Sequence, residues 1–258
     1  MKTRLKEFAY SSPMWTAIEI ALFAVILFSL PNALKLGETA EFILHIICRA
    51  LAVICAFVLA KTLNFKLFTK TKISLAEIFV LFLGFLVCVN NFPIIGFIKG
   101  NVYIFENAKI FRYIIYCIMI GVAEEFVFRG LIMPLVGWYF KSRKRAPLIT
   151  VAISSLIFSL CHLFNIFSQG IVPTLLQIGY TFLTGGLFGI VFFITENLAF
   201  PIFLHIVFDL GGLMFSSPFG IAAGNMWDVL TIIITAALSV FATAVYFVKV
   251  YNYKKADS

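Results

Sequence analysis

Charged residues are scarce in this chain of 258 residues: they make up 12% of it, whereas a soluble globular domain carries about a quarter. Hydrophobic residues make up 62% of the chain, and its mean hydropathy is +1.04. These values exclude an ordinary soluble domain and indicate an integral membrane protein. Because no polar domain accompanies the apolar sequence, we expect a single transmembrane domain over residues 1–258.

Acidic residues are also few, and Lys and Arg outnumber them by 20 to 12, which gives a formal net charge of +8. A basic balance can indicate nucleic-acid binding, but these basic residues lie in short loops between apolar runs. No nucleic-acid recognition module accompanies them. We therefore expect no nucleic-acid partner and assign the charge to membrane topology.

Disulfide and metal-binding patterns are missing as well. The five cysteines form no Cys-x-x-Cys pair and all fall within apolar runs, so we expect them to be packing residues. The sequence has no His-Glu-x-x-His helix, no low-complexity tract and no clear internal repeat. The pair Gly185-x-x-x-Gly189 predicts a close contact between two helices.

The chain consists mainly of apolar runs, each near the ~20 residues that cross a bilayer. We predict an all-α membrane protein, a polytopic bundle of about eight transmembrane helices with a central polar cavity. The first run is long for a signal-peptide core and no small-x-small cleavage site follows it, so we expect it to be retained. The predicted spans are Met14–Leu30, Phe42–Ala60, Leu75–Ile98, Ile110–Trp138, Pro147–Phe167, Thr174–Ile194, Leu198–Phe215 and Val229–Val250.

Lys and Arg concentrate in alternate connections: the N-terminus, residues 61–72, residues 141–145 and the C-terminal tail. The connections between them are poor in basic residues. By the positive-inside rule, this distribution predicts that both termini lie in the cytosol. The short loops and the strong basic asymmetry favour a bacterial cell membrane.

The fourth apolar run contains charged residues in the stretch Gly121-Val-Ala-Glu124-Glu125-Phe-Val-Phe-Arg129-Gly130. A charge at the centre of a membrane helix costs at least roughly 2.5–3.5 kcal/mol and usually marks function. Glu125 and Arg129 are four residues apart, so they share a helix face and can pair. Glu124 lies about 100° away and has no partner on its own helix, which suits a carboxylate for general acid–base work.

Two further spans carry polar residues one helical turn apart: Phe158-Ser-Leu-Cys-His162 and His205-Ile-Val-Phe-Asp209. Phe158 can pack beneath the imidazole of His162 and aim it. Each pair alone is also compatible with structural packing. Three spans that each contribute acid–base groups can, however, converge on one hydrated cavity and hydrolyse an amide bond there.

The motifs Glu-Glu-x-x-x-Arg, Phe-x-x-x-His and His-x-x-x-Asn/Asp occur in this order between about residues 110 and 215. This combination resembles the CAAX prenyl endopeptidase and bacteriocin-immunity (Abi, CPBP) family of intramembrane glutamate proteases. The resemblance implies that Glu124 and His162 activate the attacking water and that Glu125 and Arg129 hold the geometry of the site. It also implies a peptidase that needs no metal or other cofactor.

The same resemblance implies that His205 and the residue at position 209 stabilise the oxyanion. Where the prenyl-endopeptidase branch has an Asn that can donate a hydrogen bond, this chain resembles the bacterial branch in having Asp209. Two roles follow from this departure. Asp209 orients His205, or it stays protonated in a dry site and donates directly.

Other functions use the same residues. Glu124, His162, His205 and Asp209 are chemically suited to bind zinc with one position left for water. A non-catalytic bacteriocin-immunity or transport protein would use the buried charges for proton relay or for helix packing. For the peptidase, we expect a membrane-associated substrate, such as a prenylated tail or a leader peptide, reached within the lipid bilayer.

A second polar stripe recurs every fourth residue at the outer end of the second span: Glu41, His45 and Arg49. Residues at this spacing lie on one helix face. We expect an ion-paired helix end. The alternative is that the stripe contacts substrate or caps the cavity.

Overall fold

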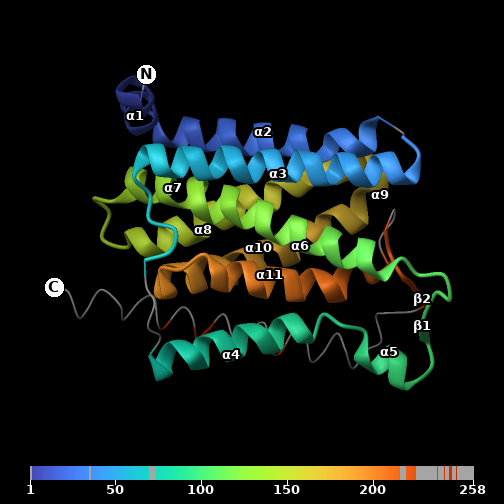
Figure 1. The fold of residues 1–258 in the computed structure, drawn as a ribbon. Coiled ribbons are helices and arrows are strands. Elements are labelled where there is room, and N and C mark those ends of the chain that lie inside the picture. Colours follow the sequence, from blue (N-terminus) through green and yellow to red (C-terminus); the bar gives the residue numbers. More distant parts are fainter. Residues whose placement is uncertain are drawn as a thin grey trace.

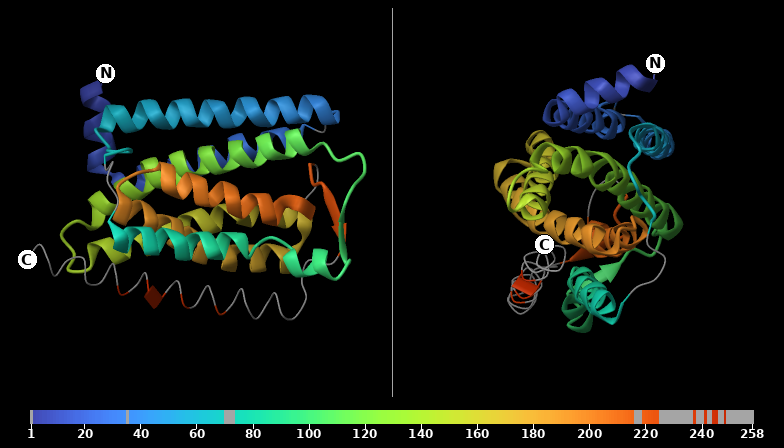
Figure 2. Two further views of the ribbon diagram at one scale, coloured as in Figure 1. Left: turned by 60° about the horizontal axis from the view of Figure 1, so that its bottom comes forward. Right: turned by 90° about the vertical axis from the view of Figure 1, so that its left-hand side faces the viewer.

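The computed structural model describes residues 2–34, 36–69, 74–215 and 219–224, together with five single positions between 237 and 248. The described chain is almost entirely helical, and its long helices run lengthwise in one bundle (Figures 1 and 2). The predicted all-α class is therefore confirmed. The eighth predicted span, Val229–Val250, lies outside the continuous described ranges.

Four helical stretches of the described residues are long and apolar enough to cross a membrane. A membrane protein is thus confirmed, while the predicted number of about eight spans is not. One of the four, Ala146–Gln169, consists of the helices α8 (Ala146–Cys161) and α9 (Ile166–Gln169), which a 3₁₀ turn at His162–Asn165 joins. The four are α2 (Pro13–Ala33), α3 (Glu38–Leu63), the stretch Ala146–Gln169 and α10 (Ile171–Thr195).

The helix with the double glutamate motif is continuous from α6 (Ile110–Val127) to α7 (Met133–Phe140). A π-helical turn, Phe128–Ile132, joins the two, and all five of its residues are buried. Such π turns often occur at functional sites. Here the turn contains Arg129, and the preceding helix α6 packs against α3 and α11 (Ala199–Gly212).

The third predicted span, Leu75–Ile98, is wrong as one continuous helix. The structure has α4 (Leu75–Val89) and a separate short α5 (Ile94–Ile98). Pro93 lies at the break, where it has no N–H to donate and disfavours helical geometry in the residue before it. The broken segment packs onto α11, and the side-chain amide of Asn91 donates to the carbonyl of Phe208 over 2.8 Å.

Glycine allows α10 and α8 to lie close together, as the Gly185-x-x-x-Gly189 pattern predicts. A Cβ atom at Gly185 would lie only 2.9 Å from Cδ1 of Phe158, and one at Gly189 would lie 3.5 Å from Cγ1 of Val151. Small residues let two helix backbones approach each other closely within a membrane. The predicted close contact is confirmed.

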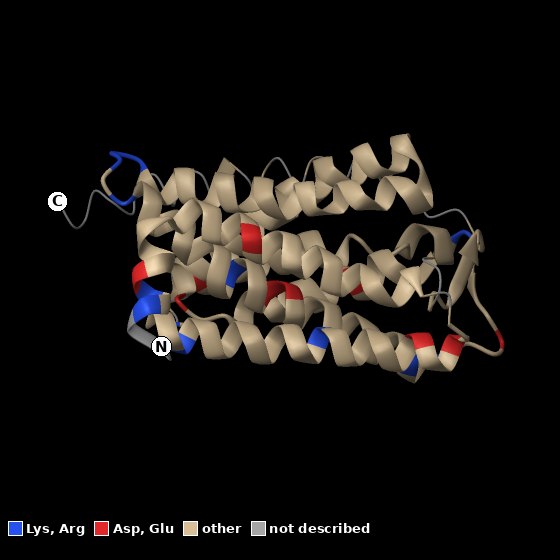
Figure 3. Cartoon of the chain, turned by 90° about the horizontal axis from the view of Figure 1, so that it is seen from above, with Lys and Arg blue, Asp and Glu red and all other residues tan. Residues whose placement is uncertain are grey.

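The two ends of the bundle differ in charge and in structure. Lys and Arg gather at the end where the N-terminus and α1 (Lys2–Ser11) lie (Figure 3). At the opposite end, β1 (Val102–Ile104) pairs antiparallel with β2 (Ala222–Gly224) (Figure 1). The basic end is the one that the positive-inside rule places in the cytosol, and the orientation stays a prediction.

Candidate active site

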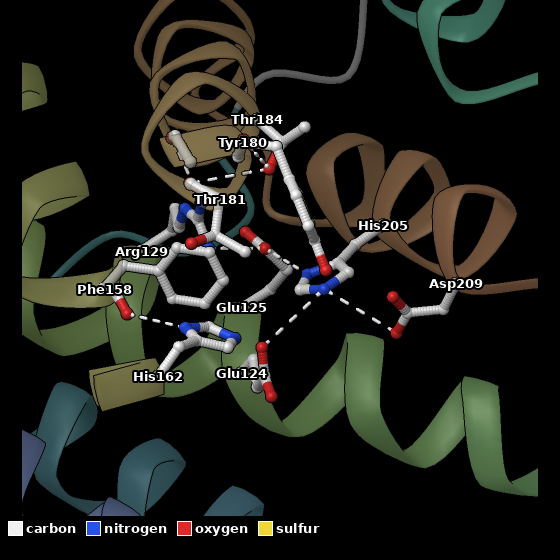
Figure 4. A network of polar contacts seen from close by, with 11 residues as sticks. Glu124, Glu125, Arg129, Phe158, His162, Tyr180, Thr181, Thr184, His205 and Asp209 are labelled. Atoms are coloured by element: carbon white, nitrogen blue, oxygen red, sulfur yellow. Dashed lines mark hydrogen bonds and ion pairs between the residues drawn. The ribbon is translucent and has the colours of Figure 1, made fainter. Parts of the chain in front are cut away.

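The three motifs meet in the interior of the bundle, on α6, on α11 and at the end of α8 (Figure 4). Nε2 of His205 lies 3.7 Å from a carboxylate oxygen of Glu124 and 3.7 Å from one of Asp209. Figure 4 shows the imidazole of His162 beside the carboxylate of Glu124. The structure thus brings together the four residues that the sequence predicts as catalytic.

Glu125 links two of these helices. Its Oε1 accepts a hydrogen bond from Nη1 of Arg129 over 2.6 Å and one from Nδ1 of His205 over 2.7 Å. Its side chain is fully buried, as is nearly all of Arg129. The pairing predicted from the spacing of Glu125 and Arg129 is present. The bond to His205, which joins α6 to α11, was not predicted.

Arg129 is fixed on several sides. Its Nη2 donates to the carbonyl of Gly185 on α10 over 3.1 Å. Its guanidinium carbon lies 4.7 Å from the ring centre of Phe158 and 5.5 Å from that of Phe188, distances typical of cation–π contacts. The buried charge is therefore neutralised by Glu125, hydrogen-bonded to the backbone and packed against two aromatic rings.

The hydrogen bond to Glu125 settles which atom of His205 faces the other acids. A carboxylate paired with arginine accepts, so Nδ1 carries the proton and Nε2 is the atom turned toward Glu124 and Asp209. The two distances of 3.7 Å at Nε2 are too long for hydrogen bonds. Glu125 rather than Asp209 therefore makes the bond that orients His205.

His162 lies just past the end of α8, in the 3₁₀ turn. Its Nδ1 donates to the carbonyl of Phe158 over 3.1 Å, and the two rings meet edge to face with their centres 5.1 Å apart. The predicted contact of Phe158 with His162 is present. Since Nδ1 is engaged, Nε2 is the ring nitrogen without a hydrogen bond to the described residues.

The two adjacent glutamates differ in their surroundings. The side chain of Glu125 is 0% exposed, whereas that of Glu124 is 17% exposed. Glu124 makes no hydrogen bond to the described residues, while Glu125 accepts two with one oxygen. Glu124 is therefore the carboxylate of the pair that has exposed surface and free capacity to accept a proton.

Asp209 is held through its backbone. The hydroxyl of Tyr113 donates to the carbonyl of Asp209 over 3.2 Å and to that of Leu210 over 2.7 Å. Oδ2 of Asp209 is buried and makes no hydrogen bond within the described part of the chain. Its side chain thus points to His205 without making a hydrogen bond to it.

Residues 106–211 match the family model of the type II CAAX prenyl endopeptidase Rce1-like proteins. The resemblance to the CAAX prenyl endopeptidase family is confirmed. The matched segment contains all three motifs and every residue of the polar cluster described above, and this family is one of peptidases. No curated protein and no solved structure matches the chain.

Two partners in this site, one aromatic ring and one backbone carbonyl, could not be predicted from the sequence. Phe188 stacks on His205 with ring centres 5.0 Å apart, but it is one of 31 phenylalanines and nothing in its local pattern marks it. Gly185 was predicted as a helix contact, whereas its role as acceptor for Arg129 depends on the fold. A long-range partner of this kind has no signature in local spacing.

No group of three His, Cys, Asp or Glu side chains in the described residues is arranged to hold a metal ion. In the Rce1-like segment, Nδ1 of His205 is already bonded to Glu125. The zinc alternative, with Glu124, His162, His205 and Asp209 as ligands, stays a prediction.

Proposed function

We propose that this protein is an intramembrane endopeptidase that hydrolyses a peptide bond in a membrane-associated peptide or protein tail. The observation that carries the proposal is the contrast between two neighbouring carboxylates in a peptidase-family segment. Glu125 is buried and hydrogen-bonded to Arg129 and His205, while Glu124 is partly exposed and makes no hydrogen bond to the described residues. A reactive and a supporting carboxylate side by side fit water-activating hydrolysis.

In the proposed mechanism, Glu124 takes a proton from a water molecule that Nε2 of His162 orients. The water oxygen attacks the carbonyl carbon, and the electron pair of the C=O bond moves to the oxygen as an oxyanion. His205, protonated on both ring nitrogens, donates from Nε2 to that oxyanion while Nδ1 stays bonded to Glu125. Glu124 then returns its proton to the leaving nitrogen as the C–N bond breaks, which regenerates the carboxylate.

In the proposed mechanism, Asp209 acts either through its negative charge or as a protonated hydrogen-bond donor. If its negative charge is required beside His205, Asp209→Asn loses activity as Asp209→Ala does. If it acts as a protonated donor, the amide of Asn replaces it and only Ala loses activity. Turnover of the two variants separates the roles.

We also propose that the substrate is a peptide held at the membrane. A prenylated tail or a leader peptide, presented at the bilayer of a bacterial cell with both protein termini in the cytosol, fits a site buried among membrane helices. Comparing the peptides that accumulate in cells with the wild-type protein and with Glu124→Gln identifies the natural substrate. Peptides cut only in the presence of the wild type are the expected result.

The test is cleavage of that substrate by purified protein in lipid vesicles. We expect Glu124→Gln and His162→Ala each to lower turnover by about 10²–10⁴-fold, the usual contribution of a general acid–base group. Glu19→Gln is the matched control, because it removes an exposed carboxylate from another span. Unchanged turnover in both site variants would refute the mechanism.

Chelation tests the zinc alternative. We expect turnover to be unaffected by a metal chelator, because proton transfer by Glu124 supplies the nucleophile. Loss of activity on chelation, with recovery on adding zinc and one zinc bound per protein, would instead assign the four polar residues as ligands.

A further inference from the structure

A tyrosine that the proposed mechanism does not use lies on the face of α10 that borders the polar cluster. Tyr180, Thr184 and Phe188 are four residues apart, so they share this face. Phe188 stacks on His205, with ring centres 5.0 Å apart. The ring of Phe208 on α11 lies 6.4 Å from that of Phe188 and 6.3 Å from that of Tyr180. The face that holds His205 therefore continues to Tyr180.

The hydroxyl of Tyr180 is directed into the candidate active site. Figure 4 shows its ring extending from α10 toward His205. Asp209 and Glu124 are both close enough for their charges to act on this hydroxyl. Tyr180 is 43% exposed, whereas His205 is 4% exposed. Tyr180 thus has surface that a substrate can contact beside the groups that carry out the reaction.

Gln177 sets the direction of the Tyr180 hydroxyl. Oε1 of Gln177 accepts from Nδ2 of Asn165 over 2.8 Å and from Nε2 of Gln169 over 2.6 Å. Because that oxygen is already used, Nε2 of Gln177 is the end that interacts with the hydroxyl, and an amide nitrogen only donates. The phenol oxygen then accepts from Gln177. Its proton is left to be donated elsewhere, and within the described part of the chain no acceptor takes it.

The proposed reaction provides an acceptor for that proton. Stabilising a developing oxyanion usually involves more than one donor, and tyrosine is among the side chains that serve. His205 supplies one donor, and the neighbouring Asp209 cannot donate while it is ionised. A phenol is neutral, so it can donate beside the two carboxylates without losing its proton.

We propose that Tyr180 is a second hydrogen-bond donor to the oxyanion, together with His205. As the water oxygen bonds to the carbonyl carbon, the electron pair of the C=O bond moves to the carbonyl oxygen. The Tyr180 hydroxyl donates a hydrogen bond to that oxygen and keeps its proton, so no atom is transferred. This role rests on the proposed function.

Turnover by Tyr180→Phe in lipid vesicles tests this role. The substrate is the peptide whose cleavage in cells depends on Glu124. Because the donated bond strengthens only as charge develops, we expect kcat to fall about 10²–10³-fold, with KM changed less than about threefold. Tyr139→Phe, which removes an exposed hydroxyl on α7, is the matched control and should keep wild-type turnover. Both variants should unfold at the wild-type denaturant midpoint, since each loses only a hydroxyl group.

Gln177→Glu tests the orientation of the hydroxyl. The carboxylate can still accept from Asn165 and Gln169, but it also accepts the proton of Tyr180 and so turns that proton away from the substrate. We expect kcat to fall about 10- to 100-fold, with no further loss when the change is combined with Tyr180→Phe. A further loss of the same size in the double variant would overturn the orientation by Gln177.

The role of Tyr180 and the proposed function fail in different ways. Wild-type kcat for Tyr180→Phe, or a raised KM at unchanged kcat, would overturn the role of Tyr180 while cleavage still depends on Glu124. Cleavage that does not depend on Glu124, or no cleavage by the wild type, would refute the proposed function and this role with it.

Discussion

Two buried arginines follow the same local rule in different surroundings. Arg129 and Arg49 are 3% and 6% exposed, and each is bonded over 2.6 Å to the residue one helical turn before it. For Arg129 that residue is Glu125, a carboxylate. For Arg49 it is His45, a neutral imidazole whose Nδ1 accepts from Arg49 and whose Nε2 donates to Oδ1 of Asn32.

The difference shows that helical spacing alone does not define an ion pair. Glu125 neutralises Arg129 and passes the interaction on to His205. His45 is neutral and only orients Arg49, and no carboxylate of the described residues lies within 4.0 Å of its guanidinium. The expected ion-paired helix end is therefore wrong for Arg49. The arrangement around Arg129 builds a rigid support for a reaction centre, whereas the one around Arg49 holds the charge with a neutral ring.

Removing the compensated arginine should have the largest effect on stability. Arg129→Gln leaves Glu125 as a buried charge with only His205 beside it, so we expect a loss of about 3–5 kcal/mol in the free energy of unfolding. Denaturant titration of the protein in mixed micelles measures it. A loss no larger than that of Lys144→Gln, an exposed control, would show that Glu125 and Arg129 do not form a stabilising buried pair.

A double-mutant cycle measures the interaction energy between Glu125 and Arg129. Glu125→Gln and Arg129→Gln each remove one half of a buried pair, and the double variant removes both. We expect the double variant to be less destabilised than the sum of the two, with a coupling of about 1–3 kcal/mol. Additive losses would show that the two residues contribute independently.

The ring shared by Arg129 and His162 should have an intermediate effect. Phe158→Leu keeps an apolar side chain but removes the cation–π contact with Arg129 and the edge contact with His162. We expect a loss of about 1–2 kcal/mol in stability and a drop in turnover through misplacement of His162. Stability and turnover that both match the wild type would exclude a supporting role for Phe158.

Removing Arg49 should have the smallest effect. Arg49→Gln loses the bond to His45 and two cation–π contacts, but it also removes a buried charge that has no carboxylate of the described residues within 4.0 Å. These terms oppose each other, so we expect a change within about 1 kcal/mol, in contrast to Arg129→Gln. A loss as large as that of Arg129→Gln would mean that Arg49 has a compensating partner.

Contacts within one helix could be predicted from the sequence. The pairing of Glu125 with Arg129 and the contact of Phe158 with His162 both follow from a separation of four residues. The break at Pro93 could also have been found, because proline carries a local signal that the apolar composition of the third run obscured.

Contacts between helices could not be predicted in the same way. The bond from Glu125 to His205 joins residues 80 positions apart, and the π turn at Phe128–Ile132 forms where several helices pack around Arg129. Spacing also could not show that His45 accepts from Arg49, because a tautomer depends on all the partners of the ring. The family motifs indicated which residues meet, while the hydrogen bonds that fix each one emerged only from the fold.

Two adjacent carboxylates have different roles in the proposed mechanism: Glu124 activates water, and Glu125 holds Arg129 and His205 in place. Measuring turnover and unfolding free energy together for Glu124→Gln and Glu125→Gln tests this difference most directly. We expect Glu124→Gln to be as stable as the wild type and nearly inactive, whereas Glu125→Gln should be markedly less stable. Substantial turnover by Glu124→Gln, at wild-type stability, would contradict it.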